Sequence, residues 1–172
     1  MKRRAKYLVV GVTLLLCGIA MLSGAVPQVA TGTWQSGSAM GEARSGGAAV
    51  TLDDGRVLVF GGRTASGGIT NAVQVFDPSS NSWSDLGVVM LDARASHSAT
   101  ALADGRVLLA GGENSGGPIS SLEIYDPSSN SFSSAGVLSA PRTSHGATRL
   151  PDGRVLIRRL GRRKCPGLLR NL

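Results

Sequence analysis

The sequence predicts an all-β protein made of small sheets that stack on one another. The pentapeptide Asp-Gly-Arg-Val-Leu occurs three times in the 172 residues, with spacings of 50 and 48 residues, at Asp54–Leu58, Asp104–Leu108 and Asp152–Leu156. Short apolar runs lie on either side of each copy and are bounded by Gly, Pro, Asn and Ser, which is the pattern of strands and turns. A period of about 50 residues indicates one small sheet per unit, and each sheet must stack on a neighbour.

The repeat extends well beyond the pentapeptide. Each unit begins with an arginine that is followed three residues later by glycine or histidine; the pairs are Arg44 with Gly47, Arg94 with His97, and Arg142 with His145. A second block, Val75–Trp83, is matched by Ile124–Phe132, and Trp34 lies 49 residues before Trp83. The repeat region is therefore expected to span 33–157, with units at about 44–90 and 94–138 and a partial third unit at 142–157.

Each full unit is expected to contain four strands. The first ends near Val50–Leu52 and the second is Val57–Phe60. The Asp-Gly pair between them predicts a two-residue hairpin, because glycine accepts the positive φ that such turns need. Val57–Phe60 is apolar at every position, so both of its faces should be buried between neighbouring sheets.

A double glycine and a Gly/Ser-rich loop follow the second strand. They are Gly61-Gly62 with Arg63–Ala72 in the first unit, and Gly111-Gly112 with Glu113–Ser121 in the second. Two adjacent glycines allow the backbone to turn sharply or to pass close to another segment.

The third strand, near Val73–Asp77, runs into an Asp-Pro-Ser-Ser-Asn turn. Proline fixes φ there, and the Asp and Asn side chains can bond to local backbone, so Asp77 and Asp126 are interpreted as turn formers. The fourth strand begins near Trp83 or Phe132, whose ring should pack between adjacent sheets.

Taken together, these features resemble the Kelch repeat of β-propellers. The residues that carry the resemblance are the double glycine, the aromatic-Asp pair and the closing aromatic: Gly61, Gly62, Phe76, Asp77 and Trp83, then Gly111, Gly112, Tyr125, Asp126 and Phe132. The Asp-Gly-Arg-Val-Leu pentapeptide is most similar to the repeats of secreted or cell-surface Kelch proteins of bacteria. The resemblance implies two four-stranded blades and a partial third blade in an incomplete ring.

The third unit departs from the Kelch pattern. Ile157 is followed by Arg158-Arg159-Leu160-Gly161, where a small residue and a double glycine are expected. Kelch propellers close a ring of roughly four to eight sheets, and an open stack would expose strand edges that favour association. Three interpretations compete: a truncated or frame-shifted product, assembly with copies of itself or another Kelch chain, or a short open stack. The tail 158–172, with six basic and no acidic residues, favours the first.

The N-terminus carries a targeting signal. Four basic residues precede an apolar stretch at 7–26, expected to be helical, and the small residues 23–25 lie near its end. This pattern predicts a secretory signal peptide at 1–25, cleaved after Ala25. An uncleaved membrane anchor at 7–26 is the alternative. Both place the repeats outside the cytoplasm, in a secreted, periplasmic or cell-surface protein.

Cysteine and charge exclude several classes of protein. The residue before Cys17 is Leu16, where a lipid-attachment site needs a small residue, so lipid attachment is not expected. Removal of the signal peptide leaves Cys165 as the one cysteine, so no internal disulfide is expected. The formal charge of +7 comes from the two ends of the chain, since the repeat region has eight arginines against all 11 carboxylates. We therefore expect no nucleic-acid partner, and contact with a membrane only if the N-terminal segment stays uncleaved.

The repeats carry no catalytic motif that would indicate an enzyme. His97 and His145 occupy one slot of the repeat, which favours a role at a strand end over metal binding, and the recurring arginines favour hydrogen bonding between strands or blades. The alternative is a fragment similar to galactose oxidase, but its copper site needs several tyrosines and paired histidines. The repeats have one tyrosine, Tyr125. Neither enzymatic activity, a cofactor nor a metal is expected.

With no catalytic motif in the repeats, the sequence predicts a binding or scaffolding role. Propellers present loops on a rigid rim, so the two Gly/Ser loops form the candidate contact surface: Arg63, Thr64 and Asn71, with Glu113 and Asn114. A protein or a carbohydrate at the cell surface is the expected partner, and self-association through open blade edges is possible. The competing interpretation is that both loops are solvated connectors.

Overall fold

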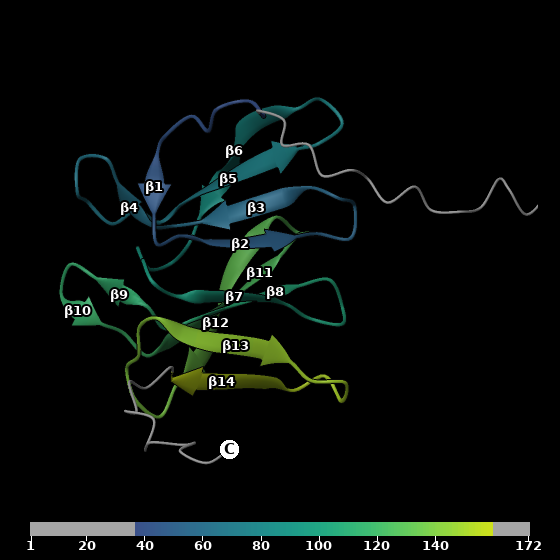
Figure 1. The fold of residues 1–172 in the computed structure, drawn as a ribbon. Helices are drawn as coiled ribbons and strands as arrows, with labels where there is room; N and C mark the ends of the chain where they lie inside the picture. The colour runs from purple at the N-terminus through teal and green to yellow at the C-terminus, as the bar shows by residue number, and fades with distance from the viewer. Residues whose placement is uncertain (1–36, 160–172) are drawn as a thin grey trace, which may run out of the picture. The chain divides into compact units, whose positions relative to one another are not determined.

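The computed structural model describes residues 37–159, and every regular element in that range is a β-strand (Figure 1). The all-β prediction is confirmed. The predicted signal peptide or anchor, Trp34, both cysteines and residues 160–172 of the predicted tail lie outside the described residues. Between residues 37 and 159, no helix has the length and apolar character needed to cross a bilayer.

Two four-stranded antiparallel sheets form blades 1 and 2. Blade 1 has the order β2-β3-β5-β6 and blade 2 the order β7-β8-β11-β12, numbered from the inner strand outward. The bounds in blade 1 are β2 (Ala48–Thr51), β3 (Val57–Phe60), β5 (Ala72–Asp77) and β6 (Ser82–Val89). Those in blade 2 are β7 (Ser98–Ala101), β8 (Val107–Ala110), β11 (Ser121–Asp126) and β12 (Ser131–Val137).

The third unit contributes a two-stranded hairpin to the described residues. It pairs β13 (His145–Arg149) with β14 (Val155–Arg159). Strand β14 continues through Arg158 and Arg159, two residues past the expected end of the repeat region. Two smaller pairs join β1 (Arg44–Ser45) with β4 (Arg63–Thr64), and β9 (Glu113–Asn114) with β10 (Gly117–Pro118).

Each Asp-Gly pair lies in a hairpin, as expected, but the loop has three residues instead of two. Leu52 N donates to Arg56 O at 2.8 Å, and Gly55 N donates to Leu52 O at 3.0 Å. Gly55 takes the positive φ of 88°. Asp54 accepts the backbone N–H of Arg56 at 3.0 Å and its Nε–H at 2.8 Å. The pentapeptide therefore closes its own loop, and the geometry matches a three-residue hairpin with glycine at its last position.

The Asp-Pro-Ser-Ser-Asn segments form turns, as the sequence predicts. Asp77 Oδ1 accepts the N–H of Ser79 at 2.8 Å, and Asp126 Oδ1 accepts that of Ser128 at 2.8 Å. The asparagine that ends each turn has a positive φ, 49° at Asn81. Asparagine tolerates this conformation better than most residues.

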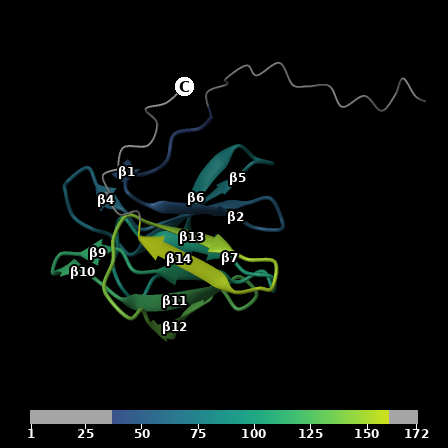
Figure 2. The ribbon, with the colours of Figure 1, turned by 60° about the horizontal axis from the view of Figure 1, so that its bottom comes forward.

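The inner strands β2, β7 and β13 lie side by side, so the three sheets stack (Figures 1 and 2). The core lies between blades 1 and 2. Phe60 of β3 is fully buried and meets Tyr125 and Phe132 of blade 2 at ring-centroid distances of 6.1 and 6.3 Å. The expectation that Phe132 packs between sheets is confirmed. Trp83 instead contacts Phe76 of its own sheet, at 5.2 Å.

The double glycines lie where one unit joins the next. Gly61 has a φ of 54°, and a Cβ there would overlap the carbonyl oxygen of Arg94. The N–H of Gly62 donates to the same oxygen at 2.9 Å. The close passage of backbone expected at these glycines is confirmed, and the segment that passes is the start of the next unit.

Candidate interaction surface

The two Gly/Ser loops lie at one rim of the sheets. Strands β3 and β8 run from an Asp-Gly hairpin at one end to a double glycine at the other, so the hairpins and the Gly/Ser loops lie at opposite ends. Strands β4, β9 and β10 all come from these loops. The loops thus contain hydrogen-bonded elements.

Arg63 and Glu113 occupy equivalent places in the two loops, and the structure brings them together. Arg63 Nη2 lies 2.9 Å from Glu113 Oε1, and Ser96 Oγ also donates to that oxygen at 3.3 Å. The arginine side chain is 45% exposed and the glutamate 27%. Such a pair adds little to stability. Its effect is to join the two loops into one surface.

Thr64 and Asn114 lie beside this pair and are held by their own loops. Thr64 Oγ1 donates to Gly68 O at 3.3 Å, and Asn114 Oδ1 accepts the N–H of Gly116 at 2.8 Å. Both are half-buried. We call Arg63, Thr64, Glu113 and Asn114 the joined loop surface.

Asn71, the fifth expected contact residue, lies apart from the other four. Its side-chain Nδ2 donates to Met90 O at 3.1 Å, and its backbone carbonyl accepts the N–H of Met90 at 3.0 Å. These bonds hold the connection between the blades, so the side chain is already occupied.

Arg94 links the two blades beneath the rim and has no exposed surface. Its backbone carbonyl bonds to Gly62 of blade 1, while its side chain donates to Gly111 O at 2.9 Å and forms an ion pair with Glu123 in blade 2. Glu123 also accepts the N–H groups of Leu91 and Asp92 at 2.8 and 2.9 Å. The recurring arginine is a structural link, as its sequence pattern predicts.

The other two recurring arginines make fewer bonds. Arg44 Nη1 donates to Gly61 O and Ala72 O at 3.3 and 3.1 Å, repeating part of the Arg94 arrangement. Arg142 Nε donates to Ala140 O at 3.4 Å.

His97 and His145 are buried at the starts of the inner strands. Burial, together with the nearby charges of Arg94 and His145, lowers the pKa of His97 to about 3. Burial also lowers the pKa of His145, as does the charge of Arg142. Both rings are therefore neutral at pH 7.

His145 Nε2 lies 2.8 Å from Ser98 Oγ, which resembles a nucleophile–base pair. Among residues 37–159, no carboxylate orients the other ring nitrogen, His145 Nδ1, which is buried. Both side chains are buried, so a substrate has no access to them. A catalytic triad needs that third group and an exposed nucleophile. In the described range 37–159, no cluster of three or more His, Cys, Asp or Glu is placed to hold a metal ion.

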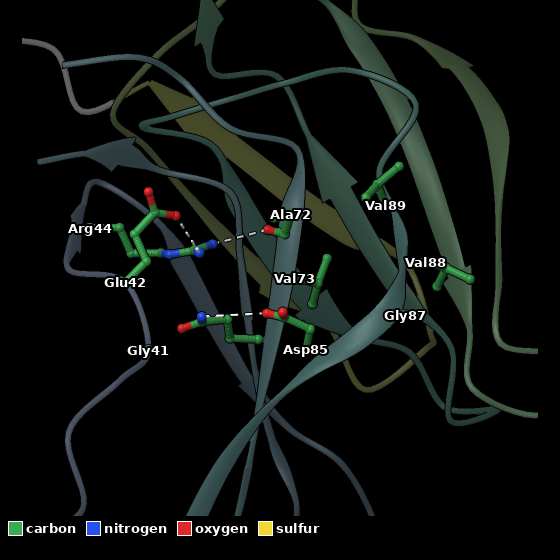
Figure 3. Close-up of a pocket in the computed structure, with 10 residues that line it drawn as sticks. Gly41, Glu42, Arg44, Ala72, Val73, Asp85, Gly87, Val88 and Val89 are labelled. Atoms are coloured by element: carbon green, nitrogen blue, oxygen red, sulfur yellow. Dashed lines mark hydrogen bonds and ion pairs between the residues drawn. The ribbon is translucent and has the colours of Figure 1, made fainter. Parts of the chain in front are cut away.

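Sequence reasoning missed a pocket of about 500 Å³ on blade 1 (Figure 3). Its polar groups are bonded to one another: Arg44 to Glu42 at 3.3 Å, and Gln74 Nε2 to Asp85 at 3.5 Å. Gln74 occupies the slot that Glu123 fills in blade 2. Strands β5 and β11 differ at five of their six positions, and this change, which removes a charge, is the signal that could have pointed to the pocket.

A family model described as the Kelch motif matches residues 44–87 and 94–136, just over half of the 172 residues. The two stretches cover nearly all of blades 1 and 2. No curated protein matches the chain.

Proposed function

Because the chain belongs to the Kelch-repeat family, we propose that it is a non-catalytic protein-interaction module that binds its partner through the joined loop surface. Kelch repeats generally mediate protein binding. The observation that carries the proposal is the ion pair between Arg63 and Glu113, which joins the loops of two blades. A surface held before binding loses less conformational entropy when the partner docks.

The chemistry of this surface suits a protein partner. Arg63 is nearly half exposed, and arginine is among the residues that contribute most to protein interfaces. Thr64 and Asn114 add polar groups held at fixed positions. The double glycines beneath are buried, and Gly62 and Gly112 are bonded to the next unit, so the loops have a firm base.

The test replaces Arg63 with alanine in the full chain. A photo-crosslinker at Ala65, an exposed loop position, is used to capture the partner in the producing cells, followed by mass spectrometry. Arg63→Ala should lower the yield of the captured protein about tenfold or more, since a central interface arginine often contributes 2 kcal/mol or more.

Arg106→Ala is the matched control. Arg106 is 44% exposed and ion-paired with Asp104, as Arg63 is with Glu113, but it lies in an Asp-Gly hairpin at the other rim. Equal capture by both variants and the wild type would overturn the proposal. Binding to a glycan array that Arg63→Ala abolishes would instead establish a carbohydrate ligand.

The proposal also places the repeats outside the cytoplasm. Its support is the basic segment followed by the apolar stretch at 7–26. Protease added to intact producing cells should digest the repeats, and N-terminal sequencing of the mature protein should begin at Val26. Full protection of the repeats until the cells are lysed would contradict this location.

A further inference from the structure

Equivalent faces of the two blades differ in burial. On blade 2, Val107 and Leu109 are fully buried and Tyr125 is 2% exposed, all against blade 1. The equivalent residues of blade 1, Val57, Val59 and Phe76, are only half-buried, whereas Trp83 and its equivalent Phe132 are half-buried alike. The strand register places Trp83 on the same face as these three residues, and we call the four together the outer face of blade 1.

The contact between blades 1 and 2 shows which kind of side chain covers such a face. Phe60 of blade 1 packs edge-on against Tyr125 and Phe132 of blade 2. Those two rings are 5.0 Å apart with an interplanar angle of 40°. Phe76 and Trp83 have nearly the same arrangement, at 5.2 Å and 44°. The two rings of blade 1 therefore have the arrangement that receives Phe60 in blade 2, and the Trp83 Nε1–H is donated to Ser38 O at 3.1 Å.

Strand β14 presents the complementary surface. Phe60 pairs with Ala48 across its hairpin, and Arg158 pairs with Gly146 at the same place in the third unit. By the same register, Leu156 takes the place of Leu58, but it is 54% exposed where Leu58 is fully buried. Leu156 and Arg158 are two residues apart, so their side chains lie on the same face of β14. We call this pair of side chains the β14 edge.

Charge also matches the two surfaces. A guanidinium placed over an aromatic face is attracted by the ring quadrupole, so Arg158 can take the place of Phe60 on the Phe76–Trp83 pair. The carboxylates of Glu42 and Asp85 line the pocket next to this face and are exposed. One chain thus carries both halves of a contact like the one between its own blades.

We propose that copies of this chain associate head to tail, with the β14 edge of one copy packed on the outer face of blade 1 of the next and Arg158 seated on Phe76 and Trp83. The contact involves no residue of the joined loop surface, so it extends the proposed function and does not depend on it. Since different surfaces meet, the interface is heterologous and builds a ring if the rotation closes.

The test measures the mass of the purified full chain by light scattering over a range of concentrations. A mild detergent keeps the apolar stretch at 7–26 from driving aggregation. The wild type should reach at least the dimer mass. Arg158→Glu should weaken association about tenfold, and Leu156→Lys should abolish it. Leu91→Lys is the matched control, because Leu91 is 57% exposed and lies outside both surfaces.

Mixing variants tests the head-to-tail geometry. A Leu156→Lys copy keeps a normal outer face, and a Trp83→Lys copy keeps a normal β14 edge. Each should be monomeric alone, and together they should form a one-to-one dimer. Circular dichroism of each variant shows whether it is folded; if Trp83→Lys unfolds, Val59→Lys replaces it.

Three results would overturn the proposal. The first is a wild-type chain that is monomeric at every concentration. The second is association that survives both Leu156→Lys and Arg158→Glu, or that Leu91→Lys also removes. The third is a mixture of the two blocked variants that stays monomeric.

Discussion

Acid should destabilise the folded repeats through His97 before the carboxylates titrate. The folded-state pKa of His97 is about 3, against 6.5 for an unperturbed histidine. Between these values the unfolded chain binds a proton that the folded chain does not. The contribution of His97 to the free energy of unfolding is therefore complete above pH 6.5. It decreases as the pH falls below 6.5, and the decrease ends near pH 3.

The size of the effect follows from the two pKa values. Between pH 7 and pH 4.5, protonation of the unfolded state at His97 alone should lower the free energy of unfolding by about 2.5 kcal/mol. Asp54, Asp77, Asp104, Asp126 and Asp152 have pKa values below 3.8, so they add to the loss only at lower pH. The lowered pKa of His145 adds to it in the same direction.

The assay is urea unfolding followed by circular dichroism at several pH values from 7 to 4.5. His97→Gln removes the titrating group, so its free energy of unfolding should change much less with pH than that of the wild type. His145→Gln serves as the comparison for the neighbouring ring. The reasoning is wrong if the wild type keeps its stability down to pH 4.5, or if His97→Gln retains the full pH dependence.

Two further predictions concern the junction between the blades, and urea unfolding at pH 7 checks both. Gly61→Ala should cost about 3 kcal/mol, because its Cβ would meet the carbonyl of Arg94 at a positive φ, whereas Gly55→Ala, at a positive φ in open space, should cost about 1 kcal/mol. Equal losses would show that the approach of Arg94 is unimportant. Glu123→Gln should cost about 3 kcal/mol by leaving the charge of Arg94 buried and poorly paired. Asp92→Asn, whose side chain is 42% exposed, should cost less than about 1 kcal/mol; a larger loss at Asp92 would refute this ranking.

Local features of the fold were predictable because their interactions lie within a few residues of sequence. Asp54 bonds to Arg56, and Asp77 to Ser79, so the turns could be identified from short motifs. The predicted length of the Asp-Gly loop was wrong by one residue, because the loop length depends on whether Leu52 or Asp53 begins the turn. That choice is set by pairing with the rest of the sheet.

The candidate site was predictable only in part. The two loops could be identified as a rim, but the contact between Arg63 and Glu113 joins residues 50 apart and depends on how the blades stack. Asn71 belongs to the same loop by sequence, yet the fold directs it to Met90. The pocket also depends on tertiary contacts: Gln74 lines it, whereas the matched residue Glu123 binds two backbone N–H groups in blade 2.

By itself the sequence determined the all-β class, the period of the repeat, the order of strands and turns, and the family, because these depend on short motifs that recur in register. Only the tertiary structure decided which side of each blade is covered, which loop residues meet, and how far burial shifts the pKa of His97. Those properties depend on the distance between side chains from different units, which the stacking of the sheets creates. The difference is clearest for Phe76 and Tyr125: they share one slot of the repeat, yet one is half-buried and the other lies in the core.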